Sequence, residues 1–329
     1  MLNLGLGAMI GMPLAGALSG KLGSRIVTFA AVAGLILSLP LLAVVADPIW
    51  LGACLALFGC SIGAIDVAAS IHGTEVQTVA RAPLMSGFHG FYSIGGLVGA
   101  SAMTLAISAG LNVLVAGVGA AAIVLLCLVF ALPGFLAARP SSEHPLFVMP
   151  KGVILLTGGL ALIVFLAEGA MLDWGALLLT QVKQVDVSFS GMGYTAFALA
   201  LTISRFMGDA VVTRFGSRTI LVAGFFLTAI GVGIAAFATG LTPVMAGITL
   251  AGFAAGNVVP ILFTLAGRQR LMPPTHAIAA VSTLGYMGVL VGPALVGYAA
   301  HLVGLQIAFG GVALLALVAI FLVPCVTAR

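Results

Sequence analysis

Long apolar stretches separated by short polar breaks divide the chain, and this pattern constrains its fold more than any other feature. A helix needs about 20 apolar residues to cross a bilayer. We expect eleven such helices, at 1–19, 26–46, 49–71, 84–107, 112–137, 152–179, 189–212, 219–239, 243–267, 277–300 and 304–326. Glycine, proline or charged residues mark the breaks between them, among which we expect a 72–83 loop. The sequence therefore predicts an all-α integral membrane protein whose surface contacts the lipid bilayer.

The scarcity of charge favours the same fold class. Charged residues make up 6% of the 329 residues, whereas soluble domains carry about 25%. So few charges could not cover the surface of a soluble protein of this size. The short connecting segments leave no room for a catalytic domain, and the sequence has neither a Walker loop nor an HExxH motif. We therefore expect no enzyme activity, no cofactor, no metal site and, because the basic residues are dispersed, no nucleic-acid partner.

The distribution of lysine and arginine predicts the orientation, because cytoplasmic loops carry an excess of both. Eleven of the twelve basic residues lie on or toward one side, Lys21, Arg139 and Arg205 among them, and only Lys183 lies on the other. The first side is then cytoplasmic. This places the C-terminus inside the cell and, with an odd number of spans, the N-terminus outside.

The two halves of the chain resemble each other at a constant offset of 193 residues, as from Gly23-Ser24-Arg25 to Gly216-Ser217-Arg218. Duplicated halves are typical of transporters. The repeat predicts an N-terminal bundle of five spans over 1–137, a cytoplasmic linker over 138–151 and a C-terminal bundle of six spans over 152–329. The first half then lacks its first span. We expect that a longer form supplies it, and a naturally eleven-span protein is the alternative.

Two loop motifs resemble those of the major facilitator superfamily. In the first copy, GALSGKLGSR, the motif positions are Gly16, Gly20, Gly23 and Arg25. In the second copy, RFMGDAVVTRFGSR, they are Arg205, Asp209, Arg214, Gly216 and Arg218. Position 20 is acidic in the family, so the resemblance implies that the charge latch of this loop survives in the second copy alone.

Two further segments, FHGFYSIGGLVGA (88–100) and AEGAMLDWGALLL (167–179), resemble the fucose-permease-like branch of the superfamily, and within it the YbjJ-type bacterial members. The resemblance covers the whole chain apart from the absent first span. It implies a twelve-span fold of two six-helix bundles, alternating access around a central site, and a multi-pass location in a bacterial inner membrane.

Ionisable residues at bilayer depth are the candidate site residues, because each costs about 2.5–3.5 kcal/mol on insertion scales. Glu168 lies near the middle of its span, where burial favours the protonated form. We expect it to couple proton binding to solute binding; a static carboxyl group bonded to a neighbouring helix is the alternative. Asp173 lies on another face of the same helix. It is a candidate for the outer gate or for an interfacial residue beside Trp174.

Asp66 and His89 lie at comparable depth in successive spans. They predict a carboxylate–imidazole pair in the inner half of the membrane, which serves as a proton relay or inner gate, or only fixes helix packing. The aromatic rings Tyr92, Trp174 and Tyr286 could stack on a sugar face, although aromatic residues in membrane helices more often serve packing.

The second half contributes two further candidates. Arg205 and Asp209 are four residues apart, which favours an ion pair along one helix face. Such a pair would hold the cytoplasmic loop or act as a gate. Asn257 lies between Gly256 and Pro260, where the interruption frees backbone carbonyl groups. It is a candidate solute contact, and an interhelical hydrogen bond is the alternative.

Together these features predict a secondary transporter that moves a small polar, sugar-like solute by alternating access, with H⁺ as the coupling ion. Two alternatives stay open. An efflux carrier for amphipathic compounds fits the apolar composition, although the Gly-Pro signature of such carriers is replaced by Gly99-Ala100. An inactive truncated membrane fragment fits the missing span.

Overall fold

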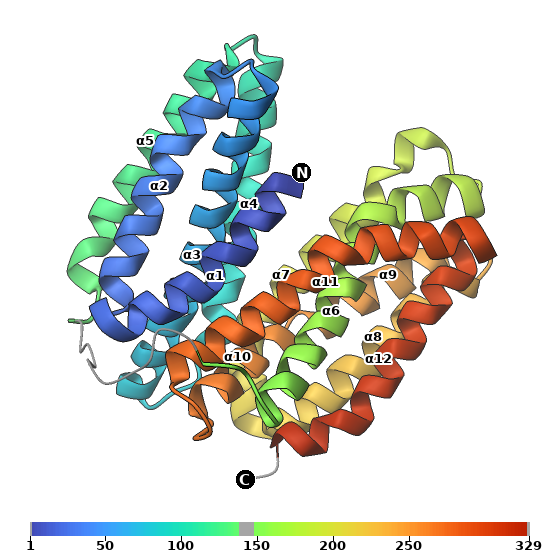
Figure 1. Ribbon diagram of the computed structural model, residues 1–329. Coiled ribbons are helices and arrows are strands. Elements are labelled where there is room, and N and C mark those ends of the chain that lie inside the picture. The colour runs from blue at the N-terminus through green and yellow to red at the C-terminus, as the bar shows by residue number, and fades with distance from the viewer. Residues whose placement is uncertain (1, 138–147, 328–329) are drawn as a thin grey trace. The chain divides into compact units, whose positions relative to one another are not determined.

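The computed structural model describes residues 2–137 and 148–327, and these residues form helices and connecting segments without a strand (Figure 1). Within them, eleven helical spans are long and apolar enough to cross a membrane. The expected fold class and the expected number of spans are thereby confirmed. Most of the linker expected at 138–151 lies outside the described residues.

The first half of the sequence contributes five spans. They are α1 (Leu2–Leu22), α2 (Ser24–Val44), α3 (Pro48–Ala80), α4 (Met85–Ser108) and α5 (Val113–Ala131), which the 3-10 turn η1 (Leu132–Gly134) extends. The expected 72–83 loop is wrong, because α3 continues to Ala80. This stretch contains no proline before Pro83, and the side chains of His72 and Gln77 within it are buried against the bundle. Polar residues there mark a packed helix end rather than a loop.

The second half contributes six spans. They are α6 (Val153–Leu177) with the π-helical turn η2 (Leu178–Val182), α7 (Gly191–Phe215) preceded by the turn η3 (Val187–Phe189), α8 (Ser217–Phe237), α9 (Leu241–Ala255) with α10 (Val258–Arg268), α11 (Pro274–Val303) and α12 (Leu305–Thr327). The helices α9 and α10 form one interrupted span, with Gly256 and Asn257 at the break. Pro260 explains this break, because a proline has no N–H group to donate to the carbonyl four residues earlier.

Two compact units make up the structure, and each includes a segment from the opposite half of the sequence. Unit 1 comprises Met1–Arg81, Ile94–Pro150 and Gly267–Thr283, and unit 2 comprises Ala82–Ser93, Lys151–Ala266 and Leu284–Arg329. The first turns of α4 thus belong to unit 2, and those of α11 belong to unit 1. The units differ from the expected bundles by these exchanged segments, and the bundle boundaries stay a prediction.

Close backbone approach holds the helices together within each unit. In unit 1, α1 crosses α3 so tightly that a Cβ atom on Gly7 would lie 2.0 Å from the carbonyl oxygen of Ala56. In unit 2, α8 packs against α9 and α12 (Figure 1). A Cβ atom on Gly231 would lie 2.5 Å from the backbone nitrogen of Ala251. Small residues at such crossings are what lipid-embedded helices use to gain van der Waals contact.

Lys183 closes the C-terminal end of α8 in unit 2. Its Nζ donates hydrogen bonds to the carbonyl oxygens of Ala236 at 2.6 Å and Ala238 at 2.7 Å. A cation at this position complements the negative end of the helix dipole. Burial lowers the pKa of the Lys183 amine from its ordinary value. Lys183, the one basic residue that the sequence predicts on the opposite side, thus has a structural role in unit 2.

Candidate functional site

Arg205, in α7, is the centre of a buried polar cluster in unit 2. Only 5% of the residue is exposed. Its Nε donates to the carbonyl oxygen of Gly256 at 3.2 Å, and its Nη1 donates to Oγ of Ser93 at 2.6 Å. Its Nη2 lies 3.8 Å from Oε1 of Glu168. Arg205 therefore joins three elements of the unit: α6, the first turns of α4, and the break between α9 and α10.

The break between α9 and α10 supplies one of the acceptors of Arg205, the carbonyl oxygen of Gly256. Gly256 lies four residues before Pro260, so the proline leaves the carbonyl group of Gly256 without its usual helical partner. The Arg205 guanidinium takes that place. A charged donor to a freed carbonyl group stabilises both the break and the buried cation. The expected Gly–Pro interruption is thus part of the site.

Glu168, in α6, is the acidic member of the cluster. It is 8% exposed, and its Oε1 has no hydrogen-bond partner among the described residues. The 3.8 Å separation from Nη2 of Arg205 is too long for a hydrogen bond, so this contact is a Coulombic one. A buried carboxylate held in this way is costly unless a proton or a ligand completes its bonding. Glu168 is therefore the group in this cluster best suited to bind a proton.

Asn257 lies at the same helix break and makes the interhelical hydrogen bonds that were the alternative to solute contact. Its Nδ2 donates to the carbonyl oxygen and to Oγ of Ser204, both at 2.8 Å. Its Oδ1 is buried and has no partner within the described parts of the chain. One acceptor of the amide is therefore left for a further donor, and a solute contact stays a prediction.

Asp209 has other partners than the Arg205 that the i, i+4 spacing suggested. Its Oδ1 accepts from the backbone N–H of Ser86 at 3.0 Å, and its Oδ2 accepts from the backbone N–H of Gly87 at 2.8 Å. These two groups belong to the first turn of α4, where N–H groups have no helical partner. The helix N-terminus also attracts a negative charge. The carboxylate of Asp209 therefore caps the N-terminus of α4, and the guanidinium of Arg205 lies beside Glu168.

The remaining ionisable candidates belong to three different helices. Asp66 is half-buried in α3 of unit 1, and His89 lies in the α4 segment of unit 2, where its ring centroid is 5.5 Å from that of Phe263. The expected Asp66–His89 pair joins two units that are described separately, so it stays a prediction. Asp173 is exposed on α6. Its role at an outer gate stays a prediction too.

Of the three aromatic candidates, Trp174 has a defined packing role. Its Nε1 donates to the carbonyl oxygen of Pro293 at 3.1 Å, and a Cβ atom on Gly297 would lie 2.6 Å from its ring. Trp174 therefore joins α6 to α11 within unit 2. Tyr92 is exposed and Tyr286 is half-buried. Stacking on a solute stays a prediction for both.

The two loop motifs form the same kind of turn. Gly23 and Gly216 adopt φ values of 87° and 80°, which glycine reaches without strain. Gly16 and Gly20 lie against the first turn of α11 in unit 1, where a Cβ atom on Gly20 would lie 3.4 Å from Oγ1 of Thr275. Three arginines of the motifs lie at helix ends: Arg25 is 5.5 Å from the Phe29 ring centroid, Arg214 is 5.3 Å from that of Phe215, and Arg218 is exposed.

Sequence reasoning missed several partners that complete the cluster. Ser204 and Ser86 carried no signal of their own, because a serine in a membrane helix usually bonds to its own backbone. Their roles follow from contacts between helices: Ser204 in α7 accepts from Asn257, and the backbone N–H of Ser86 in α4 donates to Asp209 in α7. Gly208 of α7 lets this helix approach Asn257 and Ser86 closely. A Cβ atom on Gly208 would lie 1.7 Å from Oδ1 of Asn257 and 2.6 Å from Oγ of Ser86.

We expect Gly208→Ala to destabilise the protein by about 1–3 kcal/mol, because the added methyl group must displace an amide that Ser204 fixes. Thermal unfolding of the purified chain in detergent measures this. Gly233→Ala in α8 is the matched control, since nothing lies within 4 Å of its Cβ position. A Gly208→Ala variant that unfolds at the wild-type temperature would contradict the packing described above.

A duplicated set of membrane-spanning helices, one of them interrupted beside a buried arginine–glutamate pair, defines a multi-span transport protein. The Major Facilitator Superfamily model matches residues 152–329. An MFS-type transporter of Yersinia pestis, itself uncharacterised, is 42% identical over 96% of this chain and 83% of its own length. The chain therefore belongs to the major facilitator superfamily.

Two further comparisons agree. An uncharacterised transporter of Sinorhizobium fredii is 31% identical over 98% of this chain and 87% of its own length. Among solved structures, the E. coli fucose:proton symporter superposes with a TM-score of 0.79 at 18% identity, covering 99% of this chain and 90% of that one. At this identity the likeness shows the fold alone.

Proposed function

We propose that this chain is a secondary active carrier that moves a small polar, sugar-like solute by alternating access and binds the coupling proton at Glu168. One observation carries the proposal: a buried carboxylate without a hydrogen bond on Oε1 lies 3.8 Å from a buried guanidinium in the interior of a membrane bundle. The similarity of the fold to a fucose:proton symporter supports it.

The pair explains how proton and solute binding would be linked. When Glu168 is ionised, it neutralises Arg205 and the pair holds itself together. When Glu168 takes a proton, the guanidinium loses its counter-charge and can donate to an oxygen-rich solute. The protonated carboxyl group becomes a donor as well. Proton and solute then favour each other's binding by the same factor, as linkage requires.

We also propose that the carrier lies in the bacterial inner membrane with its C-terminus in the cytoplasm, and that it belongs to the fucose-permease-like branch near the YbjJ-type members. The orientation rests on the Lys/Arg asymmetry. The structure refines one residue of that argument, because Arg205 is buried beside Glu168 and belongs to neither surface. Ten basic residues then remain on the cytoplasmic side against Lys183 on the other.

We propose in addition that a twelfth helix, equivalent to α6, completes the first half. In unit 2, a Cβ atom on Gly288 of α11 would lie 2.4 Å from the carbonyl oxygen of Leu162 in α6. The residue at the corresponding position of α4, Gly95, has nothing within 4 Å, and neither has Gly99, although both are exposed on an apolar helix. The repeat thus supports a helix that covers this face of α4.

Proteoliposomes test the transport activity without assuming the solute. The chain is reconstituted, and a panel of hexoses, pentoses and polyols is added outside while a trapped dye follows the internal pH. We expect one class of these solutes to acidify the interior, because solute and proton enter together. Liposomes that contain the Glu168→Gln variant should show no acidification.

Two outcomes would count against the proposal. If no polar solute moves protons but amphipathic compounds do, the efflux alternative replaces it. If neither polar solutes nor amphipathic compounds move protons, and the folded chain binds none of these compounds, the inactive-fragment alternative replaces it. Repeating the assay with a form that carries an additional N-terminal apolar helix separates that last result from the need for a twelfth helix.

A further inference from the structure

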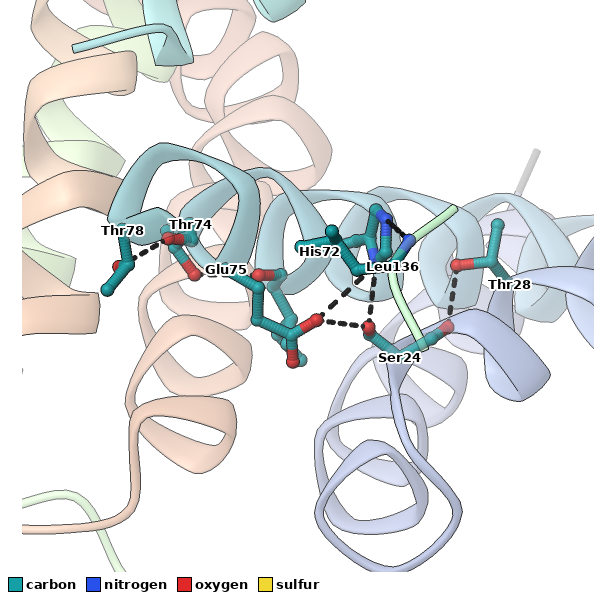
Figure 2. A network of polar contacts seen from close by, with 8 residues as sticks. Ser24, Thr28, His72, Thr74, Glu75, Thr78 and Leu136 are labelled. Carbon is teal, nitrogen blue, oxygen red and sulfur yellow. Dashed lines mark hydrogen bonds and ion pairs between the residues drawn. The ribbon is translucent and has the colours of Figure 1, made fainter. Parts of the chain in front are cut away.

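A second polar cluster lies in unit 1 and holds the segment that follows α5 (Figure 2). Ser24, the first residue of α2, donates from Oγ to Oε2 of Glu75 at 2.7 Å. Nδ1 of His72 lies 2.9 Å from Oγ of Ser24 and 3.4 Å from Oε2 of Glu75. The backbone N–H of Leu136 donates to Nε2 of His72 at 3.4 Å. Residues from α2, α3 and the segment after η1 thus meet at one imidazole ring.

The protons in this cluster have one consistent arrangement. A backbone N–H can only donate, so Nε2 of His72 must carry the lone pair and Nδ1 must carry the proton. Nδ1 then donates to the Ser24 hydroxyl group, whose own proton goes to Glu75. The result is a directed chain of donors from Leu136 through His72 and Ser24 to the Glu75 carboxylate.

This arrangement excludes a hydrolytic triad. A nucleophilic serine needs the basic nitrogen of the imidazole as its proton acceptor. Here the hydroxyl proton goes to the carboxylate, and the basic nitrogen is bonded to the backbone of Leu136. The cluster therefore holds a segment of this chain, through the backbone of Leu136, and does not form a hydrolytic site. Phe135 adds to this, because its ring centroid lies 4.7 Å from that of His72 and 5.0 Å from that of Phe29.

We propose that His72 is a protonation-controlled clasp for the segment that follows α5, Phe135 and Leu136. Phe135 and Leu136 follow η1, so the bond to His72 fixes this segment against α3. A second proton on His72 would occupy Nε2 and turn the acceptor into a donor that faces another donor. The bond to Leu136 is then lost, while the imidazolium gains an ion pair with Glu75. Acidification thus releases Leu136 from His72.

The groups around His72 are exposed enough for a proton to reach it from solvent. The side chain of Glu75 is 45% exposed, whereas that of His72 is 11% exposed. Among the described residues, Arg25 of α2 also lies near the ring stack, 5.5 Å from the Phe29 ring centroid. Lys21, at the end of α1, is exposed, and among the described residues it forms no hydrogen bond or ion pair with the cluster. Glu75 is therefore the ionisable group that faces His72 directly.

Hydrogen–deuterium exchange of the purified full chain in detergent tests the clasp. The exchange of the backbone amide of Leu136 is followed in peptides that cover 132–137 and is divided by the intrinsic rate at each pH. Between about pH 8 and about pH 5, we expect the corrected rate in the wild type to rise by about tenfold or more. His72→Gln should remove this rise, because the amide oxygen of glutamine accepts from Leu136 and does not titrate.

Two further variants keep the test decisive. Glu75→Gln should shift the release to lower pH, because the imidazolium loses its carboxylate. His144→Gln, in the linker itself, should leave the wild-type response unchanged. The proposal is overturned if the wild type shows no pH-dependent rise, if His72→Gln rises as the wild type does, or if His144→Gln abolishes the rise. Should His72→Gln not fold, an unchanged response of Glu75→Gln overturns it instead.

Discussion

Replacing Glu168 by glutamine is expected to reduce proton-driven solute uptake by about 100-fold, at the upper end of typical coupling energies, while solute exchange continues. Glutamine keeps the size of the side chain and can still hydrogen-bond to a solute. It cannot bind or release a proton, so the solute is no longer driven by the proton gradient. Uptake into proteoliposomes with an imposed gradient, compared with counterflow of labelled solute at equal pH, separates the two activities.

The matched control for this variant lies on the same helix. Asp173→Asn also neutralises an acidic residue of α6, but Asp173 is exposed whereas Glu168 is buried beside Arg205. It should keep most of the proton-driven uptake. If Glu168→Gln transports with unchanged pH dependence, Glu168 is not the proton site. If the two variants lose uptake equally, the loss follows from the charge of the helix and not from the buried pair.

Replacing Arg205 by methionine is expected to destabilise the protein by about 3–5 kcal/mol, the effect of removing one partner of a buried ion pair. The variant leaves the Glu168 carboxylate without its counter-charge and the carbonyl group of Gly256 without its donor. The loss should be smaller at acid pH, because a protonated Glu168 needs no counter-charge. Unfolding in detergent, measured at about pH 8 and about pH 5, follows both effects.

A double variant and a surface control sharpen this prediction. Combining Arg205→Met with Glu168→Gln should recover part of the stability, because the neutral pair leaves no buried charge uncompensated. Arg214→Met, at the exposed end of α7, should unfold within about 0.5 kcal/mol of the wild type. If Arg205→Met is no less stable than Arg214→Met, Arg205 does not hold the three elements of the site together.

The spans were predictable from sequence because the bilayer imposes a minimum apolar length on each helix. The break at Gly256 was predictable for a local reason, since Pro260 removes a hydrogen bond at a fixed spacing. Glu168 and Asn257 also stood out, because polar groups are rare in apolar helices. In each case a property of a single segment was sufficient.

The contact partners of the candidate residues were harder to predict than their positions in the helices. The spacing of Arg205 and Asp209 favoured a local pair, yet unpaired N–H groups at the start of α4 bind Asp209 more effectively. His72 and Glu75 were assigned to a loop, because their polarity resembled a break in the helix. Both errors have one cause: the partner comes from a segment far away in sequence, and periodicity within one helix carries no information about it.

Infrared difference spectroscopy of the full chain tests the central claim most directly, because it detects protonation of a carboxyl group without knowledge of the solute. The carbonyl band of protonated carboxyl groups is recorded as the pH is lowered, for the wild type and for Glu168→Gln. We predict a titrating band from a buried carboxyl group in the wild type that is absent from the variant. Identical titrations in both proteins would show that Glu168 takes up no proton, and the carrier would need another coupling residue.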